Sequence, residues 1–211
     1  MKHILFTFML LLASLAGHTQ QTNEKSTMNR MENKPKILVA FFSRADENYA
    51  VGYIEKGNTH IVAEMIGAET GADLFHIETV NPYPAAYNQC IEVAKREKES
   101  NARPEIKGDK RIEDYDVIFL GYPNWWGEMP MAVYTFIEKH DWEGKTIVPF
   151  CTHEGSGLSG TERRIQSACT GAKVLKGLAV RGSAAQHEQE SVRKSVSSWL
   201  EKFIFRMKIW K

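Results

Sequence analysis

Hydrophobic residues in this chain gather in short runs that polar segments separate. Three runs are almost wholly apolar, at residues 37–42, 117–120 and 146–151. Continuous apolar runs of this length are typical of strands that a parallel sheet buries on both faces. Two mixed runs, 74–77 and 174–180, are expected at the edges of the sheet, and Lys176 and Gly177 interrupt the second.

Apolar residues at helical spacing recur between these runs. They predict five helices, over residues 59–70, 84–98, 131–138, 161–169 and 188–205. Ser159 and Glu162 have the spacing of a capping box at the start of the fourth helix. Five predicted strands therefore alternate with five predicted helices along the chain.

This alternation predicts an α/β fold. It is typical of a doubly wound parallel sheet with right-handed crossovers and helices on both faces, a three-layer α/β/α arrangement. Three central and two edge strands fit the strand order 2-1-3-4-5. In such sheets ligands bind beyond the carboxyl ends of the strands. The order brings three loops together there, at residues 43–58, 122–130 and 152–160.

The composition narrows the classes of partner. The chain has 211 residues, of which 43% are hydrophobic and 25% charged, and this suits a single globular domain. Its formal net charge of +1 indicates neither nucleic-acid binding nor a strongly acidic docking surface. Cys90, Cys151 and Cys169 show no C-x-x-C pair and no metal spacing. We therefore expect buried thiols and no metal site.

Residues 1–20 have the pattern of a secretory signal peptide. Lys2 precedes an apolar stretch over 4–16, and small and polar residues follow it. The stretch is too short to cross a bilayer, which takes about 20 apolar residues. The alternative is a buried N-terminal helix. We expect export to the periplasm or envelope, with no transmembrane span in the mature chain.

The rest of the chain is divided into three predicted segments after the signal peptide. A flexible linker is expected over 21–35, a folded domain over 36–205 and a C-terminal tail over 206–211. The chain from Phe203 onward mixes aromatic and basic residues. Contact with a membrane surface and packing of the last helix both account for this mixture.

The first loop ends in Gly57, Asn58 and Thr59, directly before a predicted helix. Free backbone amides and the helix dipole favour a phosphate group at such a position. Ser43 and Thr59 can add hydroxyl donors. No lysine follows in the arrangement of an ATP-type P-loop. The alternative is that Asn and Thr serve only to begin the helix.

The second loop places Trp125 and Trp126 between Pro123 and Gly127. A tryptophan buried for packing normally sits on a strand or helix, whereas these two are at the mouth of the predicted crevice. They suit a flat aromatic ligand. A tryptophan pair at the surface or at a subunit interface is the alternative.

The third loop contains G-x-G-x-x-G at Gly155, Gly157 and Gly160. This is not a dinucleotide site, because it lies in the fourth βα unit and lacks the acidic residue that holds a ribose. His153 and Glu154 do not extend to H-E-x-x-H, which excludes that type of zinc site.

Together the three loops predict a ligand with a phosphate at one end and a flat ring at the other. Here the sequence resembles the flavodoxin-like proteins, which bind FMN. In that family an S-x-x-G-N-T loop holds the phosphate, a Y-P-x-W-W-G loop covers one side of the isoalloxazine, and a C-T-x-x-G-S-G loop lines its pyrimidine edge. The resemblance covers residues 36–203, which is most of the predicted domain, and implies a flavodoxin-like five-stranded sheet with FMN as cofactor.

The resemblance assigns cofactor binding to the matching positions. Ser43, Asn58 and Thr59 match the phosphate loop, in which Gly57 lets the backbone come close. The positions that match the two ring loops are Pro123, Asn124, Trp125, Trp126 and Gly127 for the first, and Thr152, His153, Gly155, Ser156 and Gly157 for the second.

The chain departs from the family pattern in two places. The phosphate loop carries an insertion over 45–56, with Tyr49 and Tyr53. It can be a lid over the flavin, a partner contact or a solvated excursion. Glu154 stands where a small residue is expected, which bears on the local backbone conformation.

Three functions fit the resemblance. The first is a carrier that exchanges electrons with a redox partner protein. The second is an FMN-dependent NAD(P)H:quinone-type oxidoreductase with a small quinone-like acceptor, and the third is a binding module that lacks flavin. Carriers of this family tend to be acidic, and the net charge of +1 departs from that.

We expect His153 and the amides of residues 155–157 to stabilise negative charge on the reduced ring, and Glu154 to oppose it if it points inward. A solvent-facing histidine is the alternative.

Overall fold

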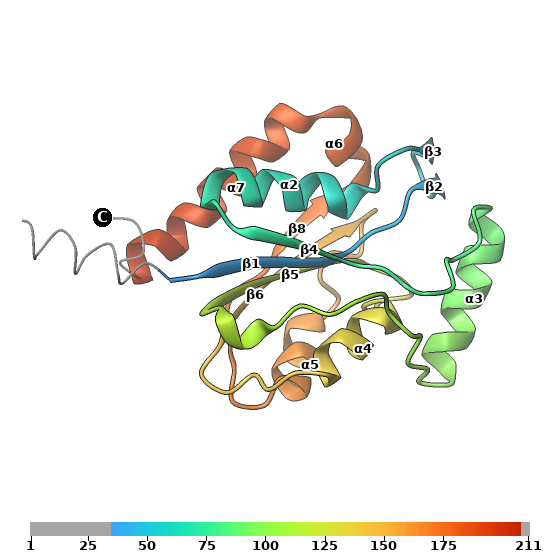
Figure 1. Cartoon of the computed structure of the whole chain (residues 1–211). Coiled ribbons are helices and arrows are strands. Elements are labelled where there is room, and N and C mark those ends of the chain that lie inside the picture. The colour runs from blue at the N-terminus through green and yellow to red at the C-terminus, as the bar shows by residue number, and fades with distance from the viewer. Residues whose placement is uncertain (1–34, 208–211) are drawn as a thin grey trace, which may run out of the picture. The chain divides into compact units, whose positions relative to one another are not determined.

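The computed structural model describes residues 35–207, and one parallel sheet forms its centre (Figure 1). The strands lie in the order β4-β1-β5-β6-β7, and β8 also pairs with β6. Their bounds are β1 Ile37–Phe42, β4 Asp73–Ile77, β5 Val117–Pro123, β6 Thr146–His153, β7 Lys173–Val174 and β8 Leu178–Arg181. Every pair in this sheet is parallel. The predicted order 2-1-3-4-5 is confirmed.

Helices cover both faces of the sheet (Figure 1). Their bounds are α2 Asn58–Thr70, α3 Tyr87–Glu99, α4 Met131–Glu138, α5 Thr161–Ala168, α6 Gly182–His187 and α7 Gln189–Met207, with a 3-10 turn η1 at Ile112–Asp114. Side chains of α2 and α7 fill the core on one face, and those of α4 and α5 fill it on the other. Helix α3 lies beyond the end of the sheet, beside a hairpin of the two short strands β2 and β3.

Alternate residues of the central strands fill two hydrophobic layers. In β1, Leu38, Ala40 and Phe42 belong to one layer, and Val39 and Phe41 to the other. All five are almost fully buried, because helices cover both faces. This explains why the central strands read as unbroken apolar runs. Burial of each large side chain contributes about 1.5–3 kcal/mol to stability.

The single edge strand predicted over 174–180 is wrong, because the chain forms two short strands, β7 and β8, on successive parts of β6. Between them the Gly177 N–H donates to the Glu162 carboxylate at 2.7 Å. The Lys176 carbonyl accepts the indole N–H of Trp199 at 3.2 Å. Side chains therefore take the backbone groups that a continuous ladder would use.

The predicted capping box at α5 is also wrong. Gly160 is the N-cap residue, with φ 76, and no side chain caps the helix. Glu162 is engaged with Gly177 instead, and Ser159 takes a left-handed conformation with φ 50. The glycine-rich turn thus sets the start of this helix without the side-chain exchange that the spacing suggested.

Two differences from the predicted helices are larger than one or two residues. Helix α3 begins at Tyr87 and not at residue 84, because the carbonyls of Pro84 and Ala85 accept hydrogen bonds from Arg44. The predicted C-terminal helix is preceded by the short helix α6, which the apolar pattern did not reveal, and α7 follows it after Glu188.

Residues 45–56, where the sequence predicts an insertion, form a β-hairpin with several exposed side chains. Its strands are β2 Asp46–Asn48 and β3 Gly52–Ile54, paired antiparallel. The Glu47 N–H donates to the Ala85 carbonyl at 3.2 Å, and the Glu47 carboxylate accepts the Tyr87 N–H at 2.8 Å. The hairpin is therefore fixed to the start of α3.

The predicted signal peptide, residues 21–34 of the linker and residues 208–211 lie outside the described residues. Within 35–207, no helix has the length and apolar character needed to cross a membrane. The three cysteines are free and buried, as expected. Burial raises the pKa of Cys151 to about 12, which keeps this thiol protonated.

Candidate functional site

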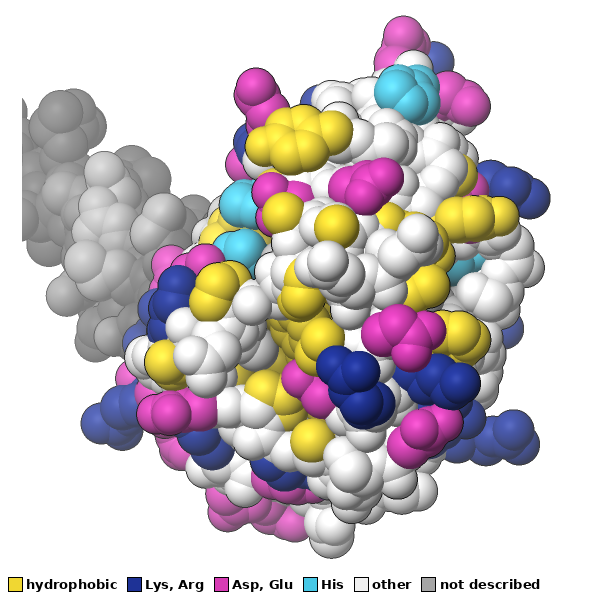
Figure 2. Space-filling model, turned by 90° about the vertical axis from the view of Figure 1, so that its right-hand side faces the viewer, with side chains coloured by type: hydrophobic (Ala, Val, Ile, Leu, Met, Phe, Trp, Pro, Cys, Tyr) yellow, Lys and Arg dark blue, Asp and Glu magenta, His cyan; other side chains and the backbone are white. Residues whose placement is uncertain are grey.

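The three predicted ligand loops meet at the carboxyl end of the sheet and border a cleft of about 370 Å³. Figure 2 shows the side of the molecule that carries α3 and the hairpin, where hydrophobic side chains line a hollow and charged side chains surround it. The predicted residues that line the cleft are Asn58, Pro123, Asn124, Trp125, Trp126, Gly127, Thr152, His153 and Ser156. Ser43, Gly57, Thr59, Gly155 and Gly157 lie in the same loops but are not among the lining residues.

The first loop leaves the start of α2 open to an anion. The Ser43 hydroxyl is buried and accepts the His60 N–H at 3.1 Å, so it caps the helix while its own hydrogen stays available. Among the described residues, the N–H groups of Asn58 and Thr59 have no hydrogen-bond partner. Free amides at the positive end of a helix bind phosphate.

The close approach of two chain segments in this loop requires Gly57. Its φ of −65° is open to any residue. A Cβ atom at this position would collide with the Ser43 Oγ and with the Arg44 carbonyl. The absence of a side chain therefore lets residues 43–44 lie directly against the start of α2 and form one cradle with it.

Arg44, which no sequence motif indicates, also belongs to this cradle. Its side chain is 9% exposed, and its guanidinium donates to the carbonyls of Glu47, Pro84 and Ala85 at 2.7–2.9 Å. Among the described residues its one carboxylate partner is Asp46, at 4.0 Å. The Arg44 Nε is buried without a hydrogen-bond partner in the described part of the chain. Arg44 also lines the cleft, and its positive charge there fits an anionic ligand.

A buried hydroxyl pair joins the first loop to the third. The Thr59 Oγ1 and the Thr152 Oγ1 lie 2.7 Å apart, and both side chains are almost fully buried. One hydroxyl donates to the other, so α2 and the end of β6 keep a fixed distance. Thr59 therefore holds the two loops together.

The two tryptophans of the second loop are held differently. Trp125 packs edge-on against Phe42 and Tyr83, with ring centroids 5.3 and 5.1 Å apart. Trp126 is 48% exposed, and its indole N–H donates to the Ile91 carbonyl at 3.1 Å. Trp125 is thus anchored in the core, and Trp126 attaches the loop to α3.

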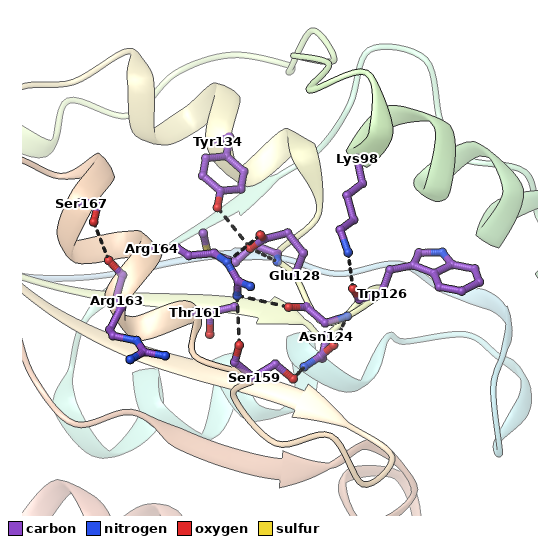
Figure 3. Close-up of polar contacts among 12 residues, drawn as sticks. Lys98, Asn124, Trp126, Glu128, Tyr134, Ser159, Thr161, Arg163, Arg164 and Ser167 are labelled. Atoms are coloured by element: carbon purple, nitrogen blue, oxygen red, sulfur yellow. Dashed lines mark hydrogen bonds and ion pairs between the residues drawn. The ribbon is translucent and has the colours of Figure 1, made fainter.

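Asn124 connects the second and third loops (Figure 3). Its amide nitrogen donates to the Gly157 carbonyl and to the Ser159 hydroxyl, both at 2.8 Å. Its amide oxygen accepts the Gly127 N–H at 3.0 Å. Gly127 has φ 73, a conformation that favours glycine. One side chain therefore satisfies backbone groups of both ring loops.

An ion pair supports the same junction (Figure 3). The Arg164 Nε lies 3.0 Å from the Glu128 carboxylate, and the guanidinium also donates to the carbonyls of Gly127 and Ser159. The Tyr134 hydroxyl donates to Glu128 at 3.1 Å, and burial raises the pKa of this tyrosine. The ring loops are therefore preorganised before any ligand enters.

His153 is a neutral side chain with a defined tautomer. Its Nδ1 accepts the Gly155 N–H at 2.8 Å, which leaves the proton on Nε2. Burial, and then the charge of Arg181, lower the pKa of His153 below its ordinary value, while Glu154 opposes them. The Gly155 amide is thus engaged by His153, whereas the amides of Ser156 and Gly157 have no partner in the described residues.

Glu154 binds the start of α6. Its carboxylate accepts the Ser183 N–H at 2.6 Å and the Ser183 hydroxyl at 3.0 Å, and Arg181 lies 3.9 Å away. It satisfies orphan donors at the start of a helix, which explains a carboxylate where a small residue was expected. Its charge is therefore partly neutralised at the edge of the cleft.

A family model described as Flavodoxin matches residues 36–202. The chain belongs to the flavodoxin family. A putative flavoprotein from Bacteroides eggerthii is 32% identical over 75% of this chain and 98% of its own, with a TM-score of 0.59. A second putative flavoprotein, from Bacteroides uniformis, is 26% identical over 80% and 99% of the two chains, with a TM-score of 0.63.

A flavoprotein from Lactobacillus acidophilus, solved in complex with FMN, shares the fold at 18% identity and a TM-score of 0.55, over 72% of this chain and 97% of its own. No curated protein matches this flavodoxin-family chain.

In this flavodoxin-family chain, the outer wall of the cleft was not predicted from the sequence. Its residues come from the hairpin and from α3: Asn48, Tyr49, Tyr87, Cys90, Ile91 and Ala94. Arg44, Glu154 and Gly182 complete the lining. The three loop motifs lie at the ends of strands and give no information on the outer wall. The one sequence signal for this wall was Tyr49, in the segment over 45–56.

Proposed function

We propose that this protein binds FMN non-covalently in the cleft and transfers electrons through it. The observation that carries the proposal is that one cleft adjoins both the open start of α2, which suits a phosphate, and the two ring loops. FMN supplies one-electron and two-electron chemistry when bound, and the protein sets its position and environment. The positive charge of Arg44 at the cleft and the free amides of Asn58 and Thr59 fit the phosphate end.

At the ring end, the chain offers donors for a pyrimidine edge. His153 presents an Nε2–H, and the amides of Ser156 and Gly157 are free among the described residues. Donors there stabilise negative charge on the reduced ring. Replacement of His153 by Ala is therefore expected to lower the reduction potential by about 30 mV, the two-electron equivalent of about 1.4 kcal/mol. An unchanged potential would remove His153 from this role.

The test of FMN binding is a fluorescence titration of the apoprotein. Gly57→Ala places a methyl group against Ser43 and Arg44 and distorts the cradle. We expect the Kd for FMN to rise about 10- to 100-fold, as for one or two lost charge-assisted hydrogen bonds. Gly67→Ala is the control, since it lies in α2 and meets the flexible end of Leu74. A wild-type chain that fails to bind FMN would overturn the proposal.

An FMN-dependent oxidoreductase is the second candidate, and the basic side chains beside Trp126 favour it. The Lys98 ammonium donates to the Trp126 carbonyl at 2.6 Å, and the Lys95 ammonium lies 5.9 Å from the Trp126 ring centroid. Among the described residues neither forms an ion pair with a carboxylate. Positive charge at the mouth attracts the phosphates of NAD(P)H.

Rapid mixing of the FMN-loaded protein with NADPH, without oxygen, separates the two candidates. Fast bleaching of the flavin absorbance would favour the oxidoreductase. Bleaching only by a protein donor would favour the carrier.

Export remains our proposal for residues 1–20. Cell fractionation with mass measurement of the mature chain tests it, since cleavage near residue 20 gives a defined mass. A cytoplasmic chain of full length would refute it.

A further inference from the structure

The short helix α6 joins the first loop of the cleft to the third. Its residue Gln186 contacts the first loop, where the side-chain nitrogen Nε2 lies 2.8 Å from the Lys56 carbonyl and 2.8 Å from the Asn58 Oδ1. At the start of the same helix, Ser183 is bound by Glu154 of the third loop. Gln186 is 130 and 128 positions from its two partners, so no motif in the sequence relates them.

The Lys56 carbonyl fixes the orientation of two side-chain amides. A carbonyl oxygen can only accept hydrogen bonds, so Gln186 must turn its nitrogen and not its oxygen toward Lys56. The second hydrogen of that nitrogen is directed to Asn58, which must therefore present its oxygen, Oδ1. The nitrogen of Asn58, Nδ2, consequently lies on the other side of the amide, and it makes no hydrogen bond to any residue within 35–207.

The free Nδ2 of Asn58 lies at the cleft. Asn58 and Gly182 both line the cleft, and Nδ2 lies against Gly182, where a Cβ atom would collide with it. In the described part of the chain the backbone N–H groups of Asn58 and Thr59 are also free, at the start of α2. Nδ2 therefore adds a side-chain donor to the backbone donors of the phosphate cradle. The same amide turned around would present an oxygen, which repels an anion.

We propose that Gln186 is a positioning residue that makes the cradle selective for a phosphorylated flavin. It holds the Asn58 amide with its donor side toward the phosphate and its acceptor side away from it. The inference rests on the proposed binding of FMN, and it identifies the residue that orients Asn58 in that site. Riboflavin has the same ring as FMN but no phosphate, so its binding does not depend on this orientation.

The experiment is a fluorescence titration of the full chain, freed of flavin, with FMN and with riboflavin. Gln186→Leu removes both donated hydrogen bonds, and we expect the Kd for FMN to rise about 5- to 10-fold. Gln186→Glu should raise it about 20- to 50-fold, because a carboxylate only accepts and therefore turns the Asn58 nitrogen toward itself. In both variants the Kd for riboflavin should change less than about 2-fold.

Gln189→Leu and Gln189→Glu are the matched controls, because Gln189 is an exposed glutamine at the start of α7 that does not line the cleft. Both should leave the two Kd values unchanged, and the second reports the effect of a nearby negative charge alone. In a chain that already carries Asn58→Ala, Gln186→Leu should change the Kd for FMN less than about 2-fold, since Gln186 acts through Asn58.

Four outcomes would overturn the inference and leave flavin binding intact. They are equal weakening of FMN and riboflavin in the Gln186 variants, additive effects in the double variant, the same Kd for FMN in Gln186→Glu as in Gln189→Glu, and equal Kd values of the wild-type chain for FMN and riboflavin. The first would mean that Gln186 only supports the fold. A wild-type chain that binds neither flavin would overturn the proposed function, and the inference with it.

Discussion

The inner and outer walls of the cleft differ in how they are built. The inner wall consists of loops that leave the ends of β1, β5 and β6, and buried contacts such as the hydroxyl pair Thr59–Thr152 join them. The outer wall consists of a hairpin and the start of α3, and its fixed points are Arg44 and Glu47. The inner wall is part of the core, whereas the outer wall is attached to it. The inner wall thus inherits the rigidity of the sheet, whereas the outer wall can vary beside it.

The largest effect is expected at the junction of the ring loops in the inner wall. Asn124→Ala removes three hydrogen bonds, to Gly157, Ser159 and Gly127. We expect a loss of about 2–3 kcal/mol in the free energy of unfolding, measured in urea, together with weaker FMN binding. Asn81→Ala, at an exposed asparagine, serves as the control. A loss similar to that of the control would mean that the loops hold their geometry without Asn124.

A smaller, local effect is expected in the outer wall. Arg44→Met keeps the length of the side chain but removes the donors to Glu47, Pro84 and Ala85. Hydrogen exchange should accelerate about tenfold in residues 45–56 and stay unchanged in β5 and β6. Lys139→Met, at an exposed cation on α4's C-terminal end, is the comparison. Acceleration throughout the sheet would show that the two walls are one cooperative unit.

Acid should weaken the fold through two histidines. Burial is the main cause that lowers the pKa of His153 and of His60 in the folded state. The unfolded chain therefore binds more protons than the folded one once the pH falls below the ordinary histidine pKa of about 6.5. Stability should be constant above that pH and fall below it. His153→Gln with His60→Gln should flatten the Tm profile between about pH 6.5 and 5, and an unchanged slope would assign the acid sensitivity to other groups.

The smallest effect is expected where the walls meet at the surface. Lys98→Ala removes an exposed hydrogen bond to the Trp126 carbonyl. We expect the free energy of unfolding to fall by about 0.5 kcal/mol or less, because water replaces the exposed donor. Lys173→Ala, on the edge strand β7, should behave alike. A loss above about 1.5 kcal/mol would make Lys98 a structural link between α3 and the ring loop.

The sheet and the position of the three loops at its carboxyl end could be predicted from the sequence. Continuous apolar runs at β1, β5 and β6 defined the sheet, and the strand order placed the three loops together. Residues whose roles come from long-range contacts were not predictable. Glu162 binds Gly177 and not the predicted cap, and Glu154 binds Ser183. Spacing along the chain carries no information on such partners.

The outer wall was missed for a related reason. Arg44 reaches the segment before α3 through backbone carbonyls, which have no sequence signature. The hairpin strands β2 and β3 are only three residues long each, too short for a period of two to be recognised. Tyr49 was visible as a tyrosine in an insertion, and its place beside Tyr87 required coordinates.

The hydroxyl pair of Thr59 and Thr152 also determines when, during synthesis of the chain, the loops around the cleft can be joined. The two residues are 93 positions apart, so their contact belongs to the slow, non-local part of folding. A nascent chain that ends before β6 lacks Thr152. In such a chain the start of α2 has no hydroxyl partner for Thr59. The proposed cofactor site is therefore completed only after β6 has joined the sheet. FMN uptake by chains of increasing length would report the moment at which this sheet closes.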